Sequence, residues 1–227
     1  MNTLLKANNI SKNYGDLKVL DKISLKVQEK EIVAIVGPSG AGKTTLLNIL
    51  GTLDDPNPDL ETSLIIEGKD VTKMTEKSIA KFRNENIGFI FQFHELLPEF
   101  SALENVCIPS WLNKKNVDVK AKAKDLLSSM GVVDKINHKP NELSGGERQR
   151  VAVARALING PKIIFADEPS GNLDSENANQ LHNIFFDLRD ELNCSFVIVT
   201  HNNHLAKRAD RIINLKDGQI NQCLIRI

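Results

Sequence analysis

The sequence has few cysteines, no excess of charge of either sign and no long apolar run. Cys107, Cys194 and Cys223 are far apart and form no Cys-x-x-Cys pair, which argues against a disulfide framework or a zinc site and favours a reducing cytosol. Lys plus Arg and Asp plus Glu number 29 each, so the formal net charge is zero. Because a dedicated nucleic-acid-binding protein usually has a basic excess, we expect no nucleic-acid partner.

The longest apolar runs, such as 32–36 and 196–199, have the length of a strand. They are far shorter than the roughly 20 apolar residues that span a bilayer. The short apolar run at the N-terminus is broken by Asn8 and Asn9, so we expect no secretory signal. If the protein serves a membrane, we therefore expect another chain to span it.

The order of apolar patterns predicts an α/β fold. A length of 227 residues suits one large domain. Apolar and polar positions alternate in the first 30 or so residues, which predicts antiparallel strands and an N-terminal β subdomain. After these, short continuous apolar runs alternate with helical segments, which predicts a P-loop NTPase core with a mostly parallel sheet. The expected buried strands are 32–36, 87–91, 163–166 and 196–199.

The expected helices set the domain organisation. We expect one helix from Thr44 to about Leu53 and another from about Ser175 to Glu191. Between them, the stretch from approximately 93 to 160 loses the rhythm of strands. It has capping-box spacing at Ser101 and helical patterns over 119–130, before Gly131, and from 144 to about 157. We interpret it as an α-helical subdomain inserted in a single domain that spans 1–227.

A glycine-rich segment matches a phosphate-binding loop. Residues 37–44 fit G-x-x-x-x-G-K-[ST] directly after a buried strand and directly before a helix. The glycines let backbone N–H groups surround phosphate oxygens, and the helix N-terminus adds its positive dipole end. We expect Lys43 to bridge the β- and γ-phosphates and Thr44 to bind Mg²⁺. The alternative, a chance glycine-rich turn, does not explain the strand–loop–helix context. The predicted ATP-binding residues are Gly37, Pro38, Ser39, Gly40, Ala41, Gly42, Lys43, Thr44 and Thr45.

Two acids end the apolar strand at 163–166. Asp167 and Glu168 follow it directly and precede Pro169, at the carboxyl end where α/β sheets bind ligands. We expect Asp167 to hold Mg²⁺ and Glu168 to polarise the attacking water as a general base. The alternative is two solvated acids at the start of a loop.

The segment 141–150, NELSGGERQR, resembles the signature motif of the ABC ATPase family. Its Ser144 and the two glycines at a helix start can present N–H groups and a helix dipole to an anion. The resemblance covers essentially the whole chain. It implies that Ser144, Gly145 and Gly146 of one copy close on the γ-phosphate of ATP bound to Lys43 of another copy, in a head-to-tail homodimer with two ATP molecules between the subunits.

Four further positions resemble family positions in chain order. Tyr14 resembles the aromatic residue that stacks on adenine, and Gln92 the glutamine that reaches Mg²⁺ and the attacking water. Asp174 lies in a segment that resembles the loop across the dimer interface, and His201 resembles the histidine that contacts the γ-phosphate. Each has a structural alternative: a half-buried aromatic, a polar strand end, a helix cap and a structural histidine.

The departures from the family pattern are small. Asn202 stands where Asp commonly follows the histidine, and Ser170 stands where Thr is common. Residues 54–59 lack the usual glycine before the hairpin. None of these changes removes an expected catalytic group.

Residues 91–106, FQFHELLPEFSALENV, are more specific and resemble the lipoprotein-releasing LolD group within a wider MacB-like set. Residues 137–140 and 206–208 resemble the same group. The resemblance implies a peripheral ATPase on the cytoplasmic face of the inner membrane, where it drives lipoprotein release through integral membrane permease subunits of the LolC and LolE type. In this reading an apolar groove receives a cytoplasmic helix of the permease, unless its residues fill the subdomain's own core. Those residues are Phe93, Leu96, Leu97, Pro98 and Phe100.

Three alternatives stay open. The same cassette could serve a MacB-like exporter or a cell-division complex, which differ only in the membrane partner. A soluble ABC protein of DNA repair or translation generally carries coiled-coil insertions or two ATPase halves, and this chain has neither. A small-molecule P-loop kinase would leave the signature-like segment without a role.

Overall fold

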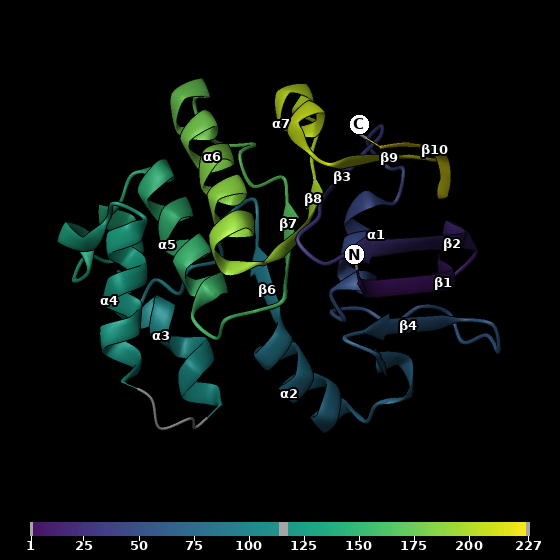
Figure 1. Ribbon diagram of the computed structural model, residues 1–227, viewed down its shortest axis with the longest axis horizontal. Coiled ribbons are helices and arrows are strands. Elements are labelled where there is room, and N and C mark those ends of the chain that lie inside the picture. Colours follow the sequence, from purple (N-terminus) through teal and green to yellow (C-terminus); the bar gives the residue numbers. More distant parts are fainter. Residues whose placement is uncertain (1, 114–117, 226–227) are drawn as a thin grey trace.

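The computed structural model describes residues 2–113 and 118–225, which form two sheets and the helices around them (Figure 1). The smaller sheet is antiparallel and is built from the N-terminal strands, as the alternating pattern predicted. In order across this sheet its strands are β2 (Leu17–Gln28), β1 (Thr3–Tyr14), β4 (Ser63–Ile66) and β5 (Lys69–Asp70).

The larger sheet is parallel except at one edge, where β10 pairs antiparallel with β9. The residues that join β9 to β10, Asp217 and Gly218, have φ of 49° and 74°, as a two-residue hairpin turn requires. In order across the sheet the strands are β10 (Gln219–Ile225), β9 (Arg211–Lys216), β3 (Ile32–Val36), β8 (Ser195–Val199), β7 (Ile163–Asp167) and β6 (Ile87–Ile90).

The central strands are buried on both faces, which explains their continuous apolar runs. In β3, Val33 and Ile35 face the core between the two sheets, while Ile32 and Ala34 face a second core under the helices. Strands β7 and β8 divide their side chains in the same way. The prediction of an α/β fold with a mostly parallel sheet and an N-terminal antiparallel sheet is therefore confirmed.

Helix α1 (Lys43–Leu50) lies between the two sheets and buries Leu46, Leu47, Ile49 and Leu50. It ends three residues before the predicted Leu53. The chain turns away because Thr52 adopts a left-handed φ of 62°, and Arg83 binds the hydroxyl and the carbonyl oxygen of Thr52.

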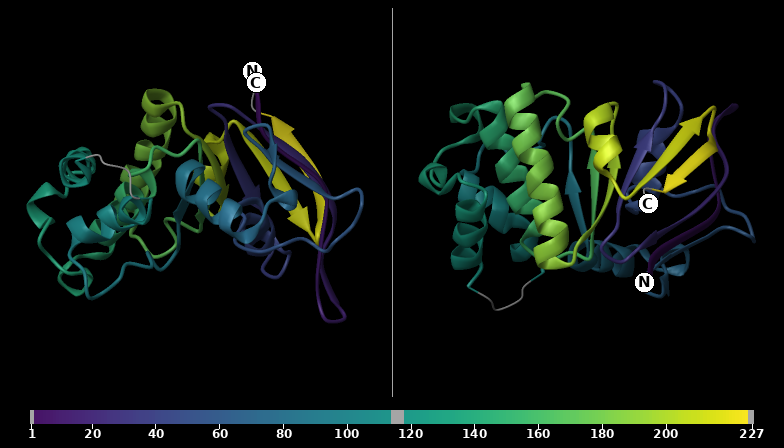
Figure 2. Two further views of the ribbon diagram at one scale, coloured as in Figure 1. Left: turned by 90° about the horizontal axis from the view of Figure 1, so that it is seen from below. Right: turned by 45° about the horizontal axis from the view of Figure 1, so that its top comes forward.

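The helices that follow β6 in the chain cover the far face of the larger sheet and its β6 edge. Helices α3, α4 and α5 lie together on the side of β6 away from the smaller sheet, in all three orientations (Figures 1 and 2). The capping box expected at Ser101 is formed, and Gly131 follows α4 with φ of 68°. The bounds are α3 (Ala102–Leu112), α4 (Val119–Ser129), α5 (Gly145–Leu157) and α6 (Ser175–Leu192), with 3₁₀ turns at Val71–Lys73, Val133–Lys135 and Pro140–Glu142.

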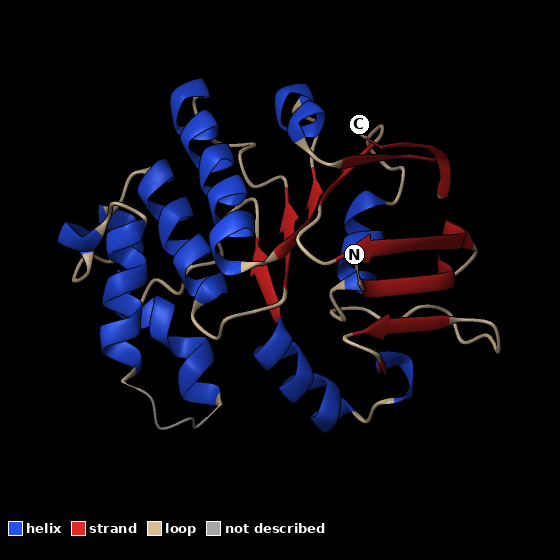
Figure 3. Cartoon of the chain, in the orientation of Figure 1, coloured by secondary structure: helices blue, strands red, loops and turns tan. Residues whose placement is uncertain are grey.

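Two helices were not predicted from the sequence: α2 (Glu76–Asn86) and α7 (Asn203–Arg208). Helix α2 buries only Phe82, so it lacks the apolar stripe that marks a helix. Figure 3 shows both helices beside the strands that follow or precede them. Within the described ranges, no helix is both long and apolar enough to cross a bilayer.

Candidate active site

The phosphate-loop segment forms a turn between β3 and α1 that excludes larger residues at two glycines. Gly37 has φ of 153°, and a Cβ there would lie 2.0 Å from the carbonyl oxygen of Leu215. Gly42 has φ of 93° and caps α1, and its Cβ would lie 2.8 Å from the carbonyl oxygen of Val19. Because Gly42 has no side chain to cap the helix, the first N–H groups of α1 remain available to an anion.

Lys43, the first residue of α1, turns its ammonium back over this loop. Its Nζ donates to the carbonyl oxygens of Gly37 at 3.0 Å and Pro38 at 2.9 Å. Lysine is a strongly hydrated point charge on a flexible stem, so exchange of these carbonyls for phosphate oxygens needs only a rotamer change. The ammonium group of Lys43, which we predict to bind phosphate, therefore lies over the loop that would hold the phosphates.

Asp167, at the end of β7, meets the start of α1. Burial, opposed by a hydrogen bond to the Thr44 side chain, raises the pKa of its carboxyl group, and the nearby charge of Glu168 raises it further. Its Oδ1 is buried and has no hydrogen-bond partner among the described residues. A desolvated carboxylate oxygen of this kind favours a cation, so Asp167 and Thr44 fit a Mg²⁺ site that ATP phosphates would complete.

Glu168 and His201 lie in contact at the carboxyl ends of β7 and β8. Nδ1 of His201 is 2.8 Å from Oε2 of Glu168, and the backbone N–H of His201 donates to the same oxygen at 3.2 Å. Glu168 has a left-handed φ of 45°, a strained conformation that often occurs at active sites. Its backbone N–H is fixed by the carbonyl oxygen of Val199 at 2.9 Å. The structure therefore brings these two predicted catalytic residues together.

Gln92 follows β6 and packs against the loop after Glu168. Its carbonyl oxygen accepts a hydrogen bond from the Asn172 side chain at 3.1 Å. A Cβ on Gly171 would lie 3.2 Å from Nε2 of Gln92, so the glutamine side chain reaches that loop closely. Since β6 and β7 are neighbours, Gln92, Asp167 and Glu168 share one end of the sheet.

Tyr14 ends β1 and is 52% exposed, so its ring is accessible to a base. Its hydroxyl donates to Oδ2 of Asp54 at 2.7 Å, and this hydrogen bond is the main reason that its pKa is raised. Nζ of Lys12 lies 5.2 Å from the ring centroid and 2.6 Å from Oδ1 of Asp54. These contacts fix the orientation of the ring.

The signature-like segment forms the start of α5. Ser144 is the N-cap: its Oγ accepts from the N–H of Glu147 at 3.2 Å, and the Glu147 carboxylate accepts from the Ser144 N–H at 2.7 Å. A Cβ on Gly146 would lie 2.6 Å from Oδ1 of Asn177, so a larger residue there would displace the Asn177 side chain. Asp174 caps α6 through Asn177, which is the structural alternative weighed for it.

Figure 1 separates the signature-like helix from the phosphate loop, with α5 among the helices and α1 on the other side of β6, β7 and β8. Within the described residues, no hydrogen bond joins 144–146 to 37–45. One copy of the chain thus brings together the predicted phosphate-loop, metal and catalytic residues, which are 37–45, Gln92, Asp167, Glu168 and His201. The predicted signature residues 144–146 lie apart from this group in the same copy.

The two substituted positions have clear contacts. Asn202 is the N-cap of α7 and accepts from the N–H groups of His204 and Leu205, a role that asparagine performs as well as aspartate. Oγ of Ser170 lies 3.0 Å from Nε2 of the fully buried His182. Both departures from the family pattern therefore preserve local hydrogen bonding.

Several contact residues were missed from the sequence. Lys12 could have been found, because residues two apart on a strand share a face and Lys12 and Tyr14 both lie on β1. Asp54, His182 and Asn177 come from other segments and carry no local signal of their contacts with Tyr14, Ser170 and Gly146.

Comparison with known proteins agrees with this geometry. The family model described as ABC transporter matches residues 20–171. The lipoprotein-releasing system ATP-binding protein LolD of Bacteroides thetaiotaomicron is 55% identical over 96% of this chain and 99% of its own length. The protein of the same name from Cytophaga hutchinsonii is 54% identical over 97% of this chain and 100% of its own length.

Solved structures extend the agreement to the whole fold. A dimeric post-hydrolysis state of the ATP-binding cassette MJ0796, bound to ADP and Pi, has a TM-score of 0.89, 36% identity and coverage of 97% of this chain and 98% of that chain. Another dimeric structure of MJ0796, described as a bacterial ABC transporter cassette, has a TM-score of 0.90 and 37% identity. The resemblance to the LolD group is confirmed, and the chain belongs to the ABC transporter family as one of its ATP-binding, ATP-hydrolysing cassettes.

Proposed function

We propose that this cassette hydrolyses ATP to drive the release of lipoproteins from the inner membrane, as a peripheral subunit on the cytoplasmic face. The observation that carries the proposal is the meeting of Asp167 with Thr44 beside the phosphate loop, in a chain 55% identical to a protein named for lipoprotein release. Extraction of a lipid anchor costs roughly 0.8 kcal/mol for each buried CH₂ group, so work from ATP is needed.

The roles of the site residues follow from their positions. Residues 37–45 hold the phosphates of ATP, and the exposed face of Tyr14 stacks on the adenine. Thr44, Gln92 and Asp167 would hold Mg²⁺, which would neutralise phosphate charge when bound. Glu168 removes a proton from the attacking water, and His201 keeps the Glu168 carboxylate in position at 2.8 Å until ATP is bound, then contacts the γ-phosphate.

Closure of the site requires a second copy of the chain. Ser144, Gly145 and Gly146 start α5, and Figure 1 shows this helix and α1 on opposite sides of β6, β7 and β8. In the proposal, these residues therefore bind the γ-phosphate held by the partner. Asp174 lies near the same interface. We place these signature residues in a helical subdomain at about 93–160, within one domain spanning 1–227, and its movement opens and closes the pair. ATP drives closure because it binds the closed state more tightly.

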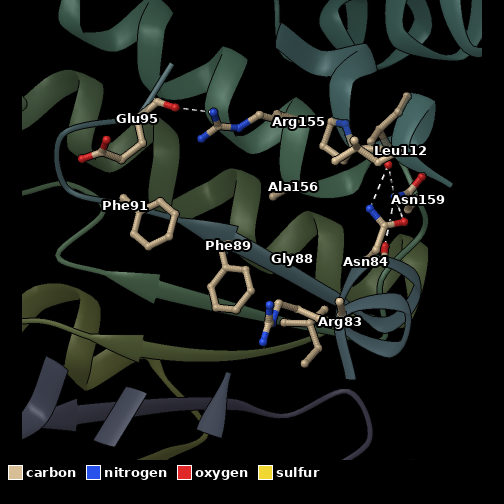
Figure 4. A pocket seen from close by; sticks show the side chains of 14 residues that line it. Arg83, Asn84, Gly88, Phe89, Phe91, Glu95, Leu112, Arg155, Ala156 and Asn159 are labelled. Atoms are coloured by element: carbon tan, nitrogen blue, oxygen red, sulfur yellow. Dashed lines mark hydrogen bonds between the residues drawn. The ribbon is translucent and has the colours of Figure 1, made fainter. Parts of the chain in front are cut away.

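A groove beside this subdomain supplies a surface for the permease. A pocket of about 450 Å³ lies between α2, β6, α3 and α5, and Figure 4 shows Phe89, Phe91 and Leu112 along it with Glu95 at one rim. The lining of this pocket contains none of the five residues predicted to form the groove. Of those five, Phe93 is 71% and Leu97 43% exposed, whereas Leu96 packs against the core under the helices. Apolar side chains at this exposure suit a cytoplasmic helix of a LolC- or LolE-like subunit. In the proposal, this pocket and the exposed side chains beside it form the surface that receives the permease helix.

The experiment that tests the proposal is the substitution Glu168→Gln in the full chain. Because a general base contributes about 100-fold or more to a rate, we expect ATP turnover to fall by at least this factor while ATP-dependent dimers accumulate on size-exclusion chromatography. The matched variant Glu168→Gln with Ser144→Arg should bind ATP and stay monomeric. Full turnover in Glu168→Gln would remove Glu168 as the base, and dimers that survive Ser144→Arg would remove the composite site.

A further inference from the structure

The turn after Gln92 holds two consecutive residues in a conformation that favours glycine. His94 has φ of 66° and Glu95 has φ of 48°, and neither is a glycine. Side chains other than glycine seldom adopt this left-handed region because Cβ approaches the following carbonyl oxygen. Such a conformation persists only where surrounding contacts hold it.

Arg155 provides those contacts. Its guanidinium donates to the carbonyl oxygen of His94 at 2.7 Å and also to that of Glu95, and Figure 4 shows the second hydrogen bond from α5 across to the turn. Burial lowers the pKa of Arg155, against the nearby charge of Glu95. One half-buried guanidinium thus binds both strained residues, and its planar fork suits two carbonyls in a way that a lysine ammonium does not.

The same turn is tied to the catalytic centre and to the signature-like residues. It begins directly after Gln92, whose carbonyl oxygen accepts from Asn172 in the loop that follows Glu168. Arg155 is on α5, ten residues after Gly145, which corresponds to about 15 Å along the helix. A rigid movement of α5 therefore moves Arg155 and the turn that it holds.

We propose that Arg155 is a positioning residue that holds the strained His94–Glu95 turn and so places Gln92 for hydrolysis. Because Arg155 lies on α5, the helix that begins at the signature-like residues also carries the side chain that holds this turn. The inference rests on the proposed function, in which Gln92 acts on the attacking water.

The test is steady-state ATP hydrolysis by the purified full chain with Arg155→Met, which keeps an unbranched apolar side chain and removes the guanidinium. Misplacement of a reacting group by about 1 Å can cost on the order of 100-fold, so we expect kcat to fall about 10- to 100-fold. The KM for ATP should change by less than about threefold, because the hydrogen bonds of Arg155 to described residues go to His94 and Glu95 and not to residues 37–45 or Tyr14. The kcat of Arg155→Lys should lie between that of the parent and that of Arg155→Met.

A second substitution separates strain from a general loss of packing. Glu95→Gly removes the Cβ that makes the left-handed conformation costly, so the turn depends less on Arg155. In the Glu95→Gly background, Arg155→Met should therefore lower kcat by less than about threefold. The same loss in both backgrounds, or no loss in either, would overturn the inference.

Arg189→Met is the matched control. Arg189 pairs with Asp190 and Asp210, and Asp210 binds the backbone N–H of Ile32 at the start of β3, the end of the strand opposite the phosphate loop. We expect its kcat to equal that of the parent. An inactive Glu168→Gln beside a fully active Arg155→Met would refute the positioning role alone, whereas full activity in both would also refute the proposed function.

Discussion

The buried His182 gives a prediction of how the stability of the fold depends on pH. His182 lies on α6 with no exposed surface, and its Nε2 is 3.0 Å from Oγ of Ser170 in the loop after Glu168. Its Nδ1 is buried without a hydrogen-bond partner among the described residues. Burial, together with the positive charges of Arg208 and His204, lowers the pKa of His182 to about 4.

The sign and size of the effect follow from the two pKa values. The unfolded chain binds a proton at this histidine below its ordinary pKa of 6.5, whereas the folded chain does so only below about 4. Between these values the unfolded state holds more protons, so the free energy of unfolding falls as the pH falls. A shift of about 2.5 pKa units at 1.36 kcal/mol each gives roughly 3 kcal/mol.

The assay is urea denaturation of the parent and of His182→Gln at several pH values between about 7 and 4. The amide of Gln can still bind Ser170 but does not titrate. All other groups are common to both proteins, so their effects cancel in the difference. The parent should lose roughly 3 kcal/mol more than the variant over this range. Parallel pH profiles would refute the assignment of a neutral, buried imidazole.

Two further predictions concern nucleotide binding. Lys43→Ala should weaken ATP binding about 10- to 100-fold, because a hydrogen bond to a charged group is worth about 1.5–3 kcal/mol; equal affinity in a fluorescent-nucleotide titration would contradict the phosphate cradle. Asp54→Ala should raise the KM for ATP by roughly threefold to tenfold with little change in kcat, because Tyr14 loses the partner of its hydroxyl at 2.7 Å. Asp54→Asn keeps an acceptor and should restore most of the affinity, and identical KM values in all three proteins would show that the ring needs no such support.

The sequence by itself determined the fold class and the family. Apolar runs buried on both faces identify β3, β7 and β8, since only a covered parallel sheet needs them. The spacing of Gly37, Gly42 and Lys43 is a local requirement of a loop that binds phosphate. The N-caps of α3 and α5 were equally readable, because a capping box is a contact within four residues.

Only the tertiary structure decided which distant segments support these motifs. Asp54 reaches Tyr14 across 40 positions, and Arg155 reaches Glu95 across 60, and no local pattern records such pairs. The left-handed turns at Thr52 and at His94–Glu95 were also invisible, because the residues with left-handed φ are not glycines and each turn depends on an arginine from another helix. Helix α2 escaped prediction because it has almost no buried face. Residues that act together within one motif are close in the sequence and can be recognised from their spacing. The contacts that position these motifs join distant segments, so they form only when the chain folds.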